Sequence, residues 1–350
     1  MNAVRIRPFG HSQEDAVAWD DYVCKHPLGS PFHLTAWKRS VETVFSYESR
    51  YLAAEDAQGN LCGVLPLFLV SNLLMGRVLM STPFAVYGGA LADSPAVLEA
   101  FAKELRALGE TLGVQYVELR NAHEEQRLGF APIDRYVTFT QEIGPDEEAI
   151  LNAIPRKTRA AVRKSLKSEL SGRKTRDWTK FEDLYARNLR RLGTPCFPRK
   201  WFGTLLENFG PQASNVHEVV ANDGQVTAAV LTLYFRDQVL PYYGASDPVY
   251  NPLQPNNFMY YDLMRLGGQS GFHLFDFGRS KREGSGSFDF KAHWGMNERP
   301  LPYEILLVRR KELPHYSPNN PKFQFAIRAW QRVPMPVART VGPFLVRMVP

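Results

Sequence analysis

The two halves of this chain predict the same order of helices and strands. In each half, a strand and several helices precede a hairpin, a further strand, a long helix and a short strand. Gly59 and Gly224, the glycines of the two predicted hairpin turns, lie 165 residues apart, and the short strands near Tyr116 and Leu274 lie 158 residues apart. Because this register agrees, we expect one α/β domain to occur twice.

The repeat also predicts the domain boundaries. We expect residues 1–142 to form a first domain and residues 143–313 a second, and 350 residues is a usual length for two domains. Residues 322–333 predict a short helix, and the rest of the tail is apolar, basic and interrupted by proline. We expect residues 314–350 to fold back and complete the first domain. A loosely ordered tail is the alternative.

Several classes of protein are disfavoured by what the sequence lacks. No apolar run reaches the about 18 residues of a membrane-spanning helix, and no apolar segment of a secretory signal follows Met1. Cys24, Cys62 and Cys196 are widely scattered, which favours neither a disulfide framework nor a zinc site. There is no His-Glu-x-x-His spacing. We therefore expect a cytoplasmic protein with no metal and no tightly bound cofactor.

Positive charge is concentrated in one segment. The net charge of the chain is +6, but residues 156–176 contain nine Lys or Arg and one acid, which gives that segment a charge of +8. Arg156, Arg159, Arg163 and Lys167 recur every three to four residues and therefore share one face of a predicted helix. We expect this face to bind an anion such as a phosphate or a nucleic acid. A solvated basic face is the alternative.

Residues 240–294 form the stretch most typical of a reactive site. A predicted strand ends in Tyr242-Tyr243-Gly244, a helix follows, and a second short strand contains Asp276. A loop rich in Gly and Ser then carries Arg279 and leads to Phe290-Lys291. Basic, glycine-rich loops at the C-terminal end of a strand are where α/β proteins usually place their chemistry.

The order of these features resembles a known family. The doubled domain pattern of the GNAT acyltransferase type, the basic helix, and the spacing from Asp276-Phe277-Gly278 to Phe290-Lys291 are similar to the FemA/FemB/FemX aminoacyltransferases. Residues 191–195 (RLGTP), Tyr242-Tyr243-Gly244-Ala245 and the ending at residues 330–343 resemble the FemAB-like subgroup associated with exosortase/PEP-CTERM systems. The resemblance covers essentially the whole chain.

This resemblance implies tandem GNAT-like domains and transfer of an aminoacyl group, in this family from aminoacyl-tRNA, to an amine on a peptidoglycan precursor. The exosortase-associated subgroup implies a cell-surface polysaccharide precursor as the acceptor. The chain lacks the long coiled-coil insertion that some members use for tRNA, so acyl-CoA or an acyl carrier protein is the alternative donor. It also lacks a Gln/Arg-x-x-Gly-x-Gly/Ala turn, by which ordinary GNAT enzymes hold the CoA pyrophosphate.

Lys291 is the first candidate for catalysis. Acyl transfer passes through a tetrahedral oxyanion that a fixed cation stabilises, and the resemblance places Lys291 at the donor site with Phe290 shaping the pocket. Asp276 is a candidate general base or amine-orienting group. For Lys291 the alternative is a surface lysine. For Asp276 the alternative is a carboxylate that caps the following loop or pairs with Arg279.

Other candidates belong to the substrate-binding surface. Tyr242 and Tyr243 are predicted to point to opposite faces of one strand, and the resemblance gives a tyrosine of this region a contact with the acceptor. Tyr243 is the third catalytic candidate and Tyr242 a candidate for substrate binding. The alternative is two ordinary strand aromatics. Arg190, Arg191 and Thr194 lie at a predicted helix end. They are candidates for holding a phosphate or carboxylate of the acceptor, or for complementing the helix dipole.

The first half contains one further candidate segment. His33, Trp37 and Lys38 resemble the segment through which Fem enzymes contact a nucleotide-sugar acceptor. The alternative is an amphipathic helix with Trp37 in the core. Cys196 has no histidine near it in the sequence, so we expect a packed side chain and no nucleophile.

Three hypotheses of function follow. The first is an N-acyl or aminoacyl transferase that acts on an amino-sugar or peptide precursor of the cell envelope or of an exopolysaccharide. The second is an acyltransferase that depends on acyl-CoA or acyl carrier protein. The third is a non-catalytic adaptor at the inner membrane surface, because the chain after Glu312 has no acid and five basic residues, Lys322, Arg328, Arg332, Arg339 and Arg347.

Overall fold

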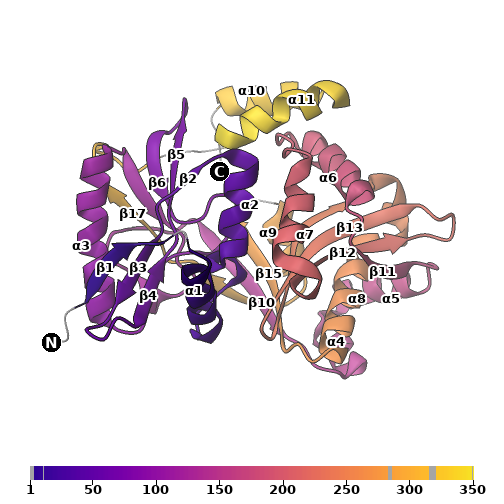
Figure 1. Cartoon of the computed structure of the whole chain (residues 1–350). Helices are drawn as coiled ribbons and strands as arrows, with labels where there is room; N and C mark the ends of the chain where they lie inside the picture. The colour runs from indigo at the N-terminus through magenta and orange to yellow at the C-terminus, as the bar shows by residue number, and fades with distance from the viewer. Residues whose placement is uncertain (1–3, 11, 283–285, 315–320, 349) are drawn as a thin grey trace. The chain divides into compact units, whose positions relative to one another are not determined.

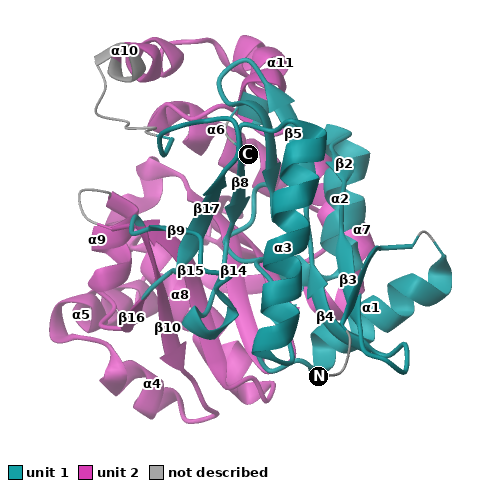
Figure 2. Cartoon of the chain, turned by 90° about the vertical axis from the view of Figure 1, so that its left-hand side faces the viewer, with its two compact units in different colours: residues 1–135, 300–317, 347–350 teal, residues 136–299, 318–346 magenta. Residues whose placement is uncertain are grey.

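The chain forms two compact units of mixed α/β structure. The computed structural model describes residues 4–10, 12–282, 286–314, 321–348 and 350 (Figure 1). Residues 1–135, 300–317 and 347–350 make unit 1, and residues 136–299 and 318–346 make unit 2 (Figure 2). Among the described residues, no helix combines the length and the apolar character needed to cross a bilayer.

Unit 1 consists of two sheets covered by helices. Its elements are β1 (Arg5–Pro8), α1 (Gln13–Lys25), η1 (Pro31–His33), α2 (Thr35–Phe45), β2 (Glu48–Ser49), β3 (Leu52–Glu55), β4 (Leu61–Leu65), β5 (Phe68–Asn72), β6 (Gly76–Met80), β7 (Leu91–Ala92), α3 (Pro95–Leu112), β8 (Tyr116–Leu119), η2 (Glu124–Gln126), β9 (Ala131–Ile133) and β17 (Tyr303–Leu307). The strand orders are β1-β3-β4-β7 and β2-β5-β6-β8-β17-β9. Val97, Phe101 and Leu105 of α3 pack into the core that both sheets share.

Two short sequence segments are each divided between these two sheets. Residues 61–70 form β4 and β5 with a break at Pro66, and residues 48–55 form β2 and β3. Proline has no N–H for a sheet ladder, so the break at Pro66 lets the chain pass from one sheet to the other. The predicted hairpin with Gly59 in its turn is confirmed as β3 and β4.

Unit 2 is built on one seven-stranded sheet. Its elements are β10 (Tyr136–Glu142), α4 (Glu147–Ala153), α5 (Arg156–Leu166), β11 (Ser171–Thr175), α6 (Thr179–Leu192), α7 (Lys200–Ala213), β12 (Ser214–Val220), β13 (Val226–Phe235), β14 (Gln238–Ser246), η3 (Pro248–Leu253), α8 (Pro255–Gln269), β15 (Leu274–Lys281), α9 (Gly286–Ala292), β16 (Asn297–Pro300), α10 (Pro321–Trp330) and α11 (Met335–Leu345). The strand order is β11-β12-β13-β14-β15-β10-β16.

Side-chain alternation along β12 decides which helix covers which face of this sheet. The hydroxyl of Ser214 donates to the carbonyl oxygen of Gly210 in α7, whereas His217 Nε2 lies 3.0 Å from the Asp262 carboxylate in α8. Side chains an odd number of residues apart in a strand point to opposite faces. Therefore α7 and α8 cover opposite faces, with α6 beside α7 and α5 beside α8.

The repeat predicted from the sequence is confirmed in the strand pairing. In unit 2, the parallel strands β14 and β15 pair at Gln238–Leu274 and Val239–Phe275. In unit 1, β6 and β8 are also parallel and also pair at two positions. A long helix, α8 or α3, connects the two strands in each case. Each unit therefore contains one parallel strand–helix–strand connection within a mainly antiparallel sheet.

Two strands, β10 and β17, belong to the other unit from the one predicted, which corrects the predicted boundaries. β9 pairs with β17 in unit 1, but β10, the next strand in the chain, pairs with β15 in unit 2. Likewise β16 lies in the sheet of unit 2, and β17 pairs with β8 in unit 1. The boundaries expected after residues 142 and 313 are therefore each wrong by one strand. Local sequence predicts a strand but not the sheet that it joins.

The C-terminal segment also differs from the prediction. α10 and α11 belong to unit 2, where α11 packs against α6. Beyond residue 317, only residues 347–350 belong to unit 1. The expectation that residues 314–350 complete the first domain is therefore wrong for both helices. The sequence does not predict α11, because prolines interrupt its pattern. However, Pro336 lies in the first helical turn, where a missing N–H is tolerated.

Candidate functional site

The parallel strands β14 and β15 separate soon after they begin. Their last paired residues are Val239 and Phe275, yet β14 continues to Ser246 and β15 to Lys281. In the described parts of both strands no further pairing between them follows, so main-chain groups on the facing edges are left for other partners. This separation, in the middle of the sheet of unit 2, is the centre of the candidate site.

A bulge in β14 lies at the start of the separation. Leu231 of β13 pairs with Tyr243 and Thr232 pairs with Pro241, so Tyr242 is an extra residue in β14. The rings of Tyr242 and Tyr243 contact each other, with their centroids 4.6 Å apart. The prediction that they point to opposite faces is therefore wrong, because the bulge interrupts the alternation that the prediction assumed.

A second bulge lies in β15 and is held by Asp276. Between Asp276 and Arg279, β15 has one residue more than the facing stretch of β10. Gly278 has a φ of +69°, in the left-handed region that favours glycine at a bulge. Asp276 Oδ1 accepts hydrogen bonds from the Gly278 N–H at 2.7 Å and from the Thr138 hydroxyl at 3.2 Å. This buried carboxylate therefore fixes the shape of the bulge.

Lys291 contacts the same bulge. Its ammonium donates hydrogen bonds to the main-chain oxygens of Phe277 at 2.6 Å, Gly278 at 2.9 Å and Arg279 at 3.1 Å. An ammonium has three donors, so main-chain groups use all of them. Burial lowers the pKa of Lys291 to about 8, while the nearby Asp276 carboxylate acts to raise it. The bulge thus holds one positive charge in a fixed position.

The segment before Lys291 is more ordered than the sequence predicts. Arg279 and Lys281 lie within β15 and not in a loop, and the guanidinium of Arg279 stacks 4.5 Å from the ring centroid of Tyr136. Lys291 lies on the short helix α9. Residues 283–285 of the predicted Gly/Ser-rich loop fall outside the described residues.

Tyr260 of α8 forms the aromatic centre of the site. Its ring packs edge-on against Phe277, with centroids 4.5 Å apart, and also contacts Phe290 and Trp294. A Cβ atom at Gly244 of β14 would lie only 2.9 Å from the Tyr260 hydroxyl oxygen. The absence of a side chain at Gly244 therefore allows Tyr260 to approach the backbone of β14.

Tyr185 and Tyr243 meet on the side covered by α6 and α7. Their ring centroids lie 5.7 Å apart, and both rings contact Phe197 and Phe202. Burial raises the pKa of Tyr185 and raises that of Tyr243 well above its ordinary value. Burial also raises the pKa of Tyr260 to about 12. All three phenols are neutral near pH 7, so they are suited to donate hydrogen bonds and not to act as general bases.

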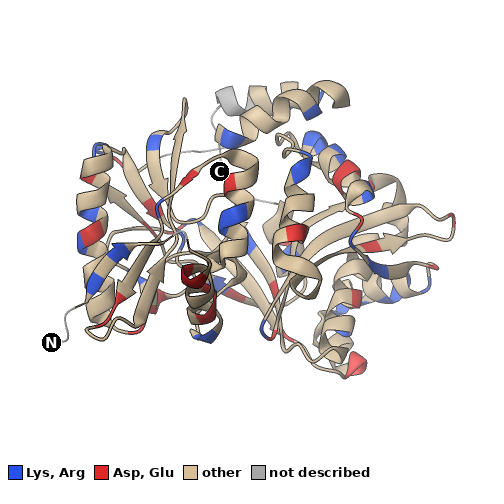
Figure 3. Cartoon of the chain, viewed as in Figure 1, with Lys and Arg blue, Asp and Glu red and all other residues tan. Residues whose placement is uncertain are grey.

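The basic face predicted for α5 borders an open groove. The groove has a volume of about 600 Å³ and is lined by Arg156, Arg159, Ala160, Arg163, Lys164 and Lys167. Figure 3 shows Lys and Arg, in blue, along α5. Among the described residues, no Asp or Glu forms an ion pair with these basic side chains. The Thr158 hydroxyl on the buried face of α5 donates to the His293 carbonyl oxygen at 2.6 Å, two residues after Lys291. This hydrogen bond holds α5, the helix that lines the groove, against the segment that carries Lys291.

Three residues predicted for acceptor binding contact the C-terminal helices. Arg190 donates to the carbonyl oxygen of Val333 at 3.1 Å, and the indole of Trp330 donates to the Thr194 carbonyl oxygen at 3.0 Å. Arg191 has an exposed side chain, but its main-chain oxygen accepts a hydrogen bond from the Gln331 amide at 3.1 Å. These contacts attach α10 and the turn that follows it to the end of α6. None of them involves the bulge at Lys291.

The candidates of the first half lie in the interior of unit 1. Trp37 is fully buried, and its indole donates to the Pro83 carbonyl oxygen at 3.2 Å. Lys38 is buried and forms an ion pair with Glu42 at 2.9 Å. His33 is also buried, and burial lowers its pKa to about 3. In this structure all three side chains take part in the packing of α1, α2 and the adjoining loops.

Sequence reasoning missed Tyr260, Gly244, Thr138 and Trp294. Tyr260 lies in a helix that the sequence predicts correctly, but the next residue, Tyr261, is also a tyrosine. Only the packing of the folded chain shows which of the two lies at the candidate site. Thr138 lies in β10, a strand predicted to belong to the first domain. Its contact with Asp276 could therefore not be predicted from the sequence. A glycine within a predicted strand does indicate a close approach, and Gly244 could have been found on that ground.

Comparisons with known proteins identify the fold. Residues 156–292 match the family model described as an acetyltransferase (GNAT) domain, and no curated protein matches the chain. The crystal structure of FemX is similar with a TM-score of 0.70 and 15% identity, covering 87% of this chain and 98% of that one. A tandem GNAT protein from the clavulanic acid biosynthesis pathway is similar with a TM-score of 0.53 and 10% identity, covering 89% of this chain and 100% of that one.

A third similar structure is the C-terminal domain of a putative lysylphosphatidylglycerol synthetase from Agrobacterium fabrum. Its TM-score is 0.54 and its identity 12%, covering 85% of this chain and 92% of that one. At these identities the likeness establishes the fold alone, which is that of tandem GNAT domains. The segment matched by the family model lies in unit 2, the unit that contains the candidate site.

Proposed function

We propose that the protein transfers an acyl or aminoacyl group to an amine at the separation of β14 and β15. The observation that carries this proposal is the charge of Lys291, fixed at the β15 bulge by three main-chain oxygens. A cation held in place before the reaction stabilises negative charge that develops on a carbonyl oxygen or on a leaving group. The match of residues 156–292 to an acetyltransferase domain supports the same class of chemistry.

The reaction would break one acyl bond and form one amide bond. The amine nitrogen attacks the donor carbonyl carbon, and the positive charge of Lys291 stabilises the tetrahedral oxyanion. The bond to the leaving oxygen of an ester, or to the leaving sulfur of a thioester, then breaks. We assign Asp276 to orient the amine or accept its proton, and the neutral phenol of Tyr243 to donate a hydrogen bond to the intermediate or leaving group. Tyr242 and Phe290 would border the acceptor and the acyl group.

We place the phosphate groups of the donor on the α5 groove. Arg156, Arg159, Arg163 and Lys167 supply cations there, and Thr158 connects their helix to the segment of Lys291. The start of α8 is a poorer phosphate site, because its first residue, Pro255, has no N–H to donate. These features favour aminoacyl-tRNA or a carrier-bound acyl group as the donor.

Acyl-CoA is the second candidate donor. The observation in its favour is the match to an acetyltransferase (GNAT) domain. A competition experiment separates the two: CoA would inhibit transfer from an acyl-CoA enzyme, whereas tRNA fragments ending in CCA would inhibit an aminoacyl-tRNA enzyme.

For the acceptor we propose an amino-sugar or peptide precursor of the cell envelope or of an exopolysaccharide. The support is the resemblance of residues 191–195 and Tyr242-Tyr243-Gly244-Ala245 to the exosortase-associated FemAB-like proteins. Such precursors are often carried by lipids, so we also propose that the tail rests on the inner membrane surface. Phe325 and Phe344 of α10 and α11 are 76% and 68% exposed, and the tail has no acid.

The test of the proposed function is a transfer assay. Purified protein is incubated with cell extract and, in separate reactions, with acyl-CoA or aminoacyl-tRNA, and mass spectrometry follows amines that gain an acyl mass. We expect an N-acylated product that depends on Lys291. A protein that forms no such product with any donor, yet co-purifies with polysaccharide-assembly proteins, would instead be a non-catalytic adaptor.

A further inference from the structure

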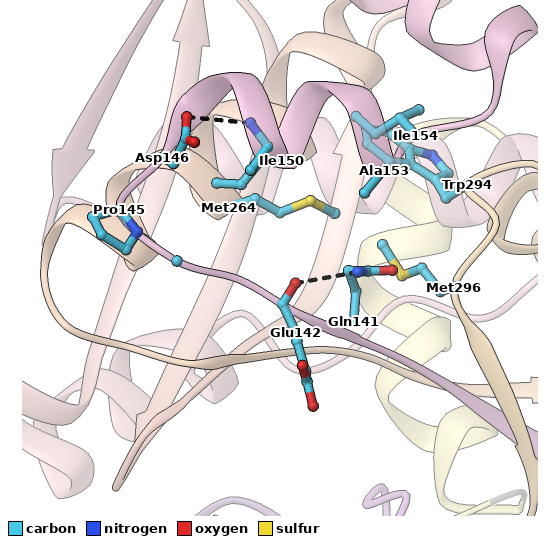
Figure 4. Close-up of a pocket in the computed structure, with 12 residues that line it drawn as sticks. Gln141, Glu142, Pro145, Asp146, Ile150, Ala153, Ile154, Met264, Trp294 and Met296 are labelled. Carbon is cyan, nitrogen blue, oxygen red and sulfur yellow. Dashed lines mark hydrogen bonds between the residues drawn. The ribbon is translucent and has the colours of Figure 1, made fainter.

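A pocket in unit 2 lies beneath α4 and is not used by the proposed reaction. It has a volume of about 160 Å³ and is bounded by α4, the end of β10, α8 and the segment after α9 (Figure 4). Its deep part consists of the buried side chains Ile150, Ile154, Met264, Trp294 and Met296. Apolar pockets of about this size accommodate a ring as large as benzene.

The mouth of the pocket opens to solvent. Glu142, Pro145, Asp146, Ala149 and Ala153 line it and are exposed, so a ligand has a route to the buried part. Figure 4 shows the Ile150 and Met264 side chains within the pocket and the Glu142 carboxylate extending away from it.

The charge at the mouth is negative. Glu142 and Asp146 belong to the lining, Glu148 follows in the first turn of α4, and the described lining contains no Lys or Arg. Glu147, in the same turn, is ion-paired with Arg265 at 3.5 Å. The Asp146 carboxylate is already engaged as the cap of α4, where it accepts from the N–H groups of Glu148 and Ala149. A carboxylate ligand would meet repulsion at this mouth, whereas a neutral or cationic ligand would not.

Trp294 forms part of the apolar floor of the pocket. Its side chain is 2% exposed, and its Nε1 atom is buried beneath the lining. The two methionines, Met264 and Met296, are side chains that adapt readily to the shape of a ligand.

We propose that this pocket binds a small apolar molecule that is neutral or cationic and is about the size of a single aromatic ring. This site does not depend on the proposed transfer reaction. However, the Trp294 ring also packs against Phe290, with centroids 6.3 Å apart, so an occupied pocket would contact a side chain that borders the candidate site.

The test uses three probes of matched size that differ in charge: benzyl alcohol, benzylamine and benzoate. Binding is followed by NMR of the full chain labelled with ¹³C at the methionine methyl groups, without any acyl donor. We expect benzyl alcohol and benzylamine to shift the Met264 and Met296 signals saturably, and benzoate to bind at least about tenfold more weakly. Met80, buried in unit 1, is the internal control and should not shift.

Two variants make the result specific. Ala153→Leu narrows the mouth and should abolish the shifts, whereas Ala160→Leu, an exposed change on α5, should leave them intact. Absence of any saturable shift of Met264 or Met296, or shifts that persist in Ala153→Leu, would overturn the proposal.

Discussion

The ammonium of Lys291 lies 2.6 Å from the main-chain oxygen of Phe277, and this bond ties α9 to the bulge of β15. The side chain is partly buried and has two further main-chain partners at Gly278 and Arg279. A lysine in a flexible loop would contribute charge alone. Here the same side chain supplies charge and supports the backbone beside Asp276, so its removal should affect both rate and stability.

Lys291→Ala should lower turnover about a hundredfold, since the loss of one fixed donor in a site of this kind typically has that effect. The melting temperature should also fall, because three buried carbonyl oxygens lose their partner. Lys291→Arg should recover part of the rate, as a planar guanidinium differs in shape from an ammonium. The measurements are the transfer assay and thermal unfolding, with the exposed Lys103→Ala on α3 as the control. If Lys291→Ala turns over at the wild-type rate, Lys291 is not catalytic, and Asp276 with Tyr242 or Tyr243 becomes the next candidate.

The pH dependence of turnover should report the charge of Lys291. Its pKa is lowered to about 8, so the cation that we assign to catalysis is lost above that pH. Turnover should therefore decline above about pH 8 in the wild type, and the decline should be absent in Lys291→Arg, whose guanidinium stays charged. A rate that rises through pH 8 would indicate that neutral Lys291 acts as a base.

The stability of the folded protein should increase with pH above about pH 8, whereas turnover should decrease. The folded-state pKa of about 8 lies below the ordinary lysine value of 10.5, so between these two values the unfolded chain binds more protons than the folded protein. The free energy of unfolding that this site contributes therefore increases as the pH rises from about 8 to 10.5. Denaturant unfolding of the wild type and Lys291→Gln at several pH values measures the difference.

The α5 groove should bind polyanions in a salt-dependent way. Replacing Arg156, Arg159, Arg163 and Lys167 by Ala should weaken binding of tRNA and flatten its dependence on salt, because each neutralised phosphate releases counterions. The matched control is the variant with the three arginines changed to Lys, which keeps the charge and should keep the slope. If binding is insensitive to salt, or if the Ala variant binds as tightly as the wild type, the four basic residues form only a solvated face.

Gly244→Ala should disturb the contact between α8 and β14. The new Cβ would lie 2.9 Å from the Tyr260 hydroxyl oxygen, and such overpacking typically costs about 1–3 kcal/mol. Tyr260→Phe removes that oxygen, so the double variant should regain most of the lost stability. Additive effects of the two substitutions in denaturant unfolding would show that the two residues do not interact as the structure indicates.

The tail should bring the protein to anionic membranes. Phe325→Ser with Phe344→Ser should reduce cosedimentation with vesicles of equal parts phosphatidylcholine and phosphatidylglycerol, while the tail itself stays in place. Pure phosphatidylcholine vesicles are the control for the basic residues of the tail other than Arg339, which is already ion-paired with Glu182 and Asp183. Each basic residue near an anionic surface adds about 1 kcal/mol. If the variant sediments like the wild type, attachment to α6 is the only role that the structure supports for α10 and α11.

The local sequence was sufficient for most helices, strands and turns of the chain. The basic helix predicted to carry Arg156 is α5, the helix predicted after Tyr242-Tyr243-Gly244 is α8, and both predicted hairpins are present. These features depend on residue periodicity and turn composition, which act over a few positions. The repeat itself could be predicted for the same reason, since two halves with the same local pattern form the same elements in the same order.

Only the tertiary structure decided which strands belong together and what surrounds Lys291. β17 joins unit 1 by pairing Glu304 with Leu119, residues 185 positions apart, and no local pattern selects that partner. The bulges at Tyr242 and Gly278 likewise arise where neighbouring strands must separate. They determine that two tyrosine rings meet and that three carbonyl oxygens converge on one ammonium. A sequence of residue types specifies the lysine, but its charge and burial depend on contacts that exist only after the sheet has formed.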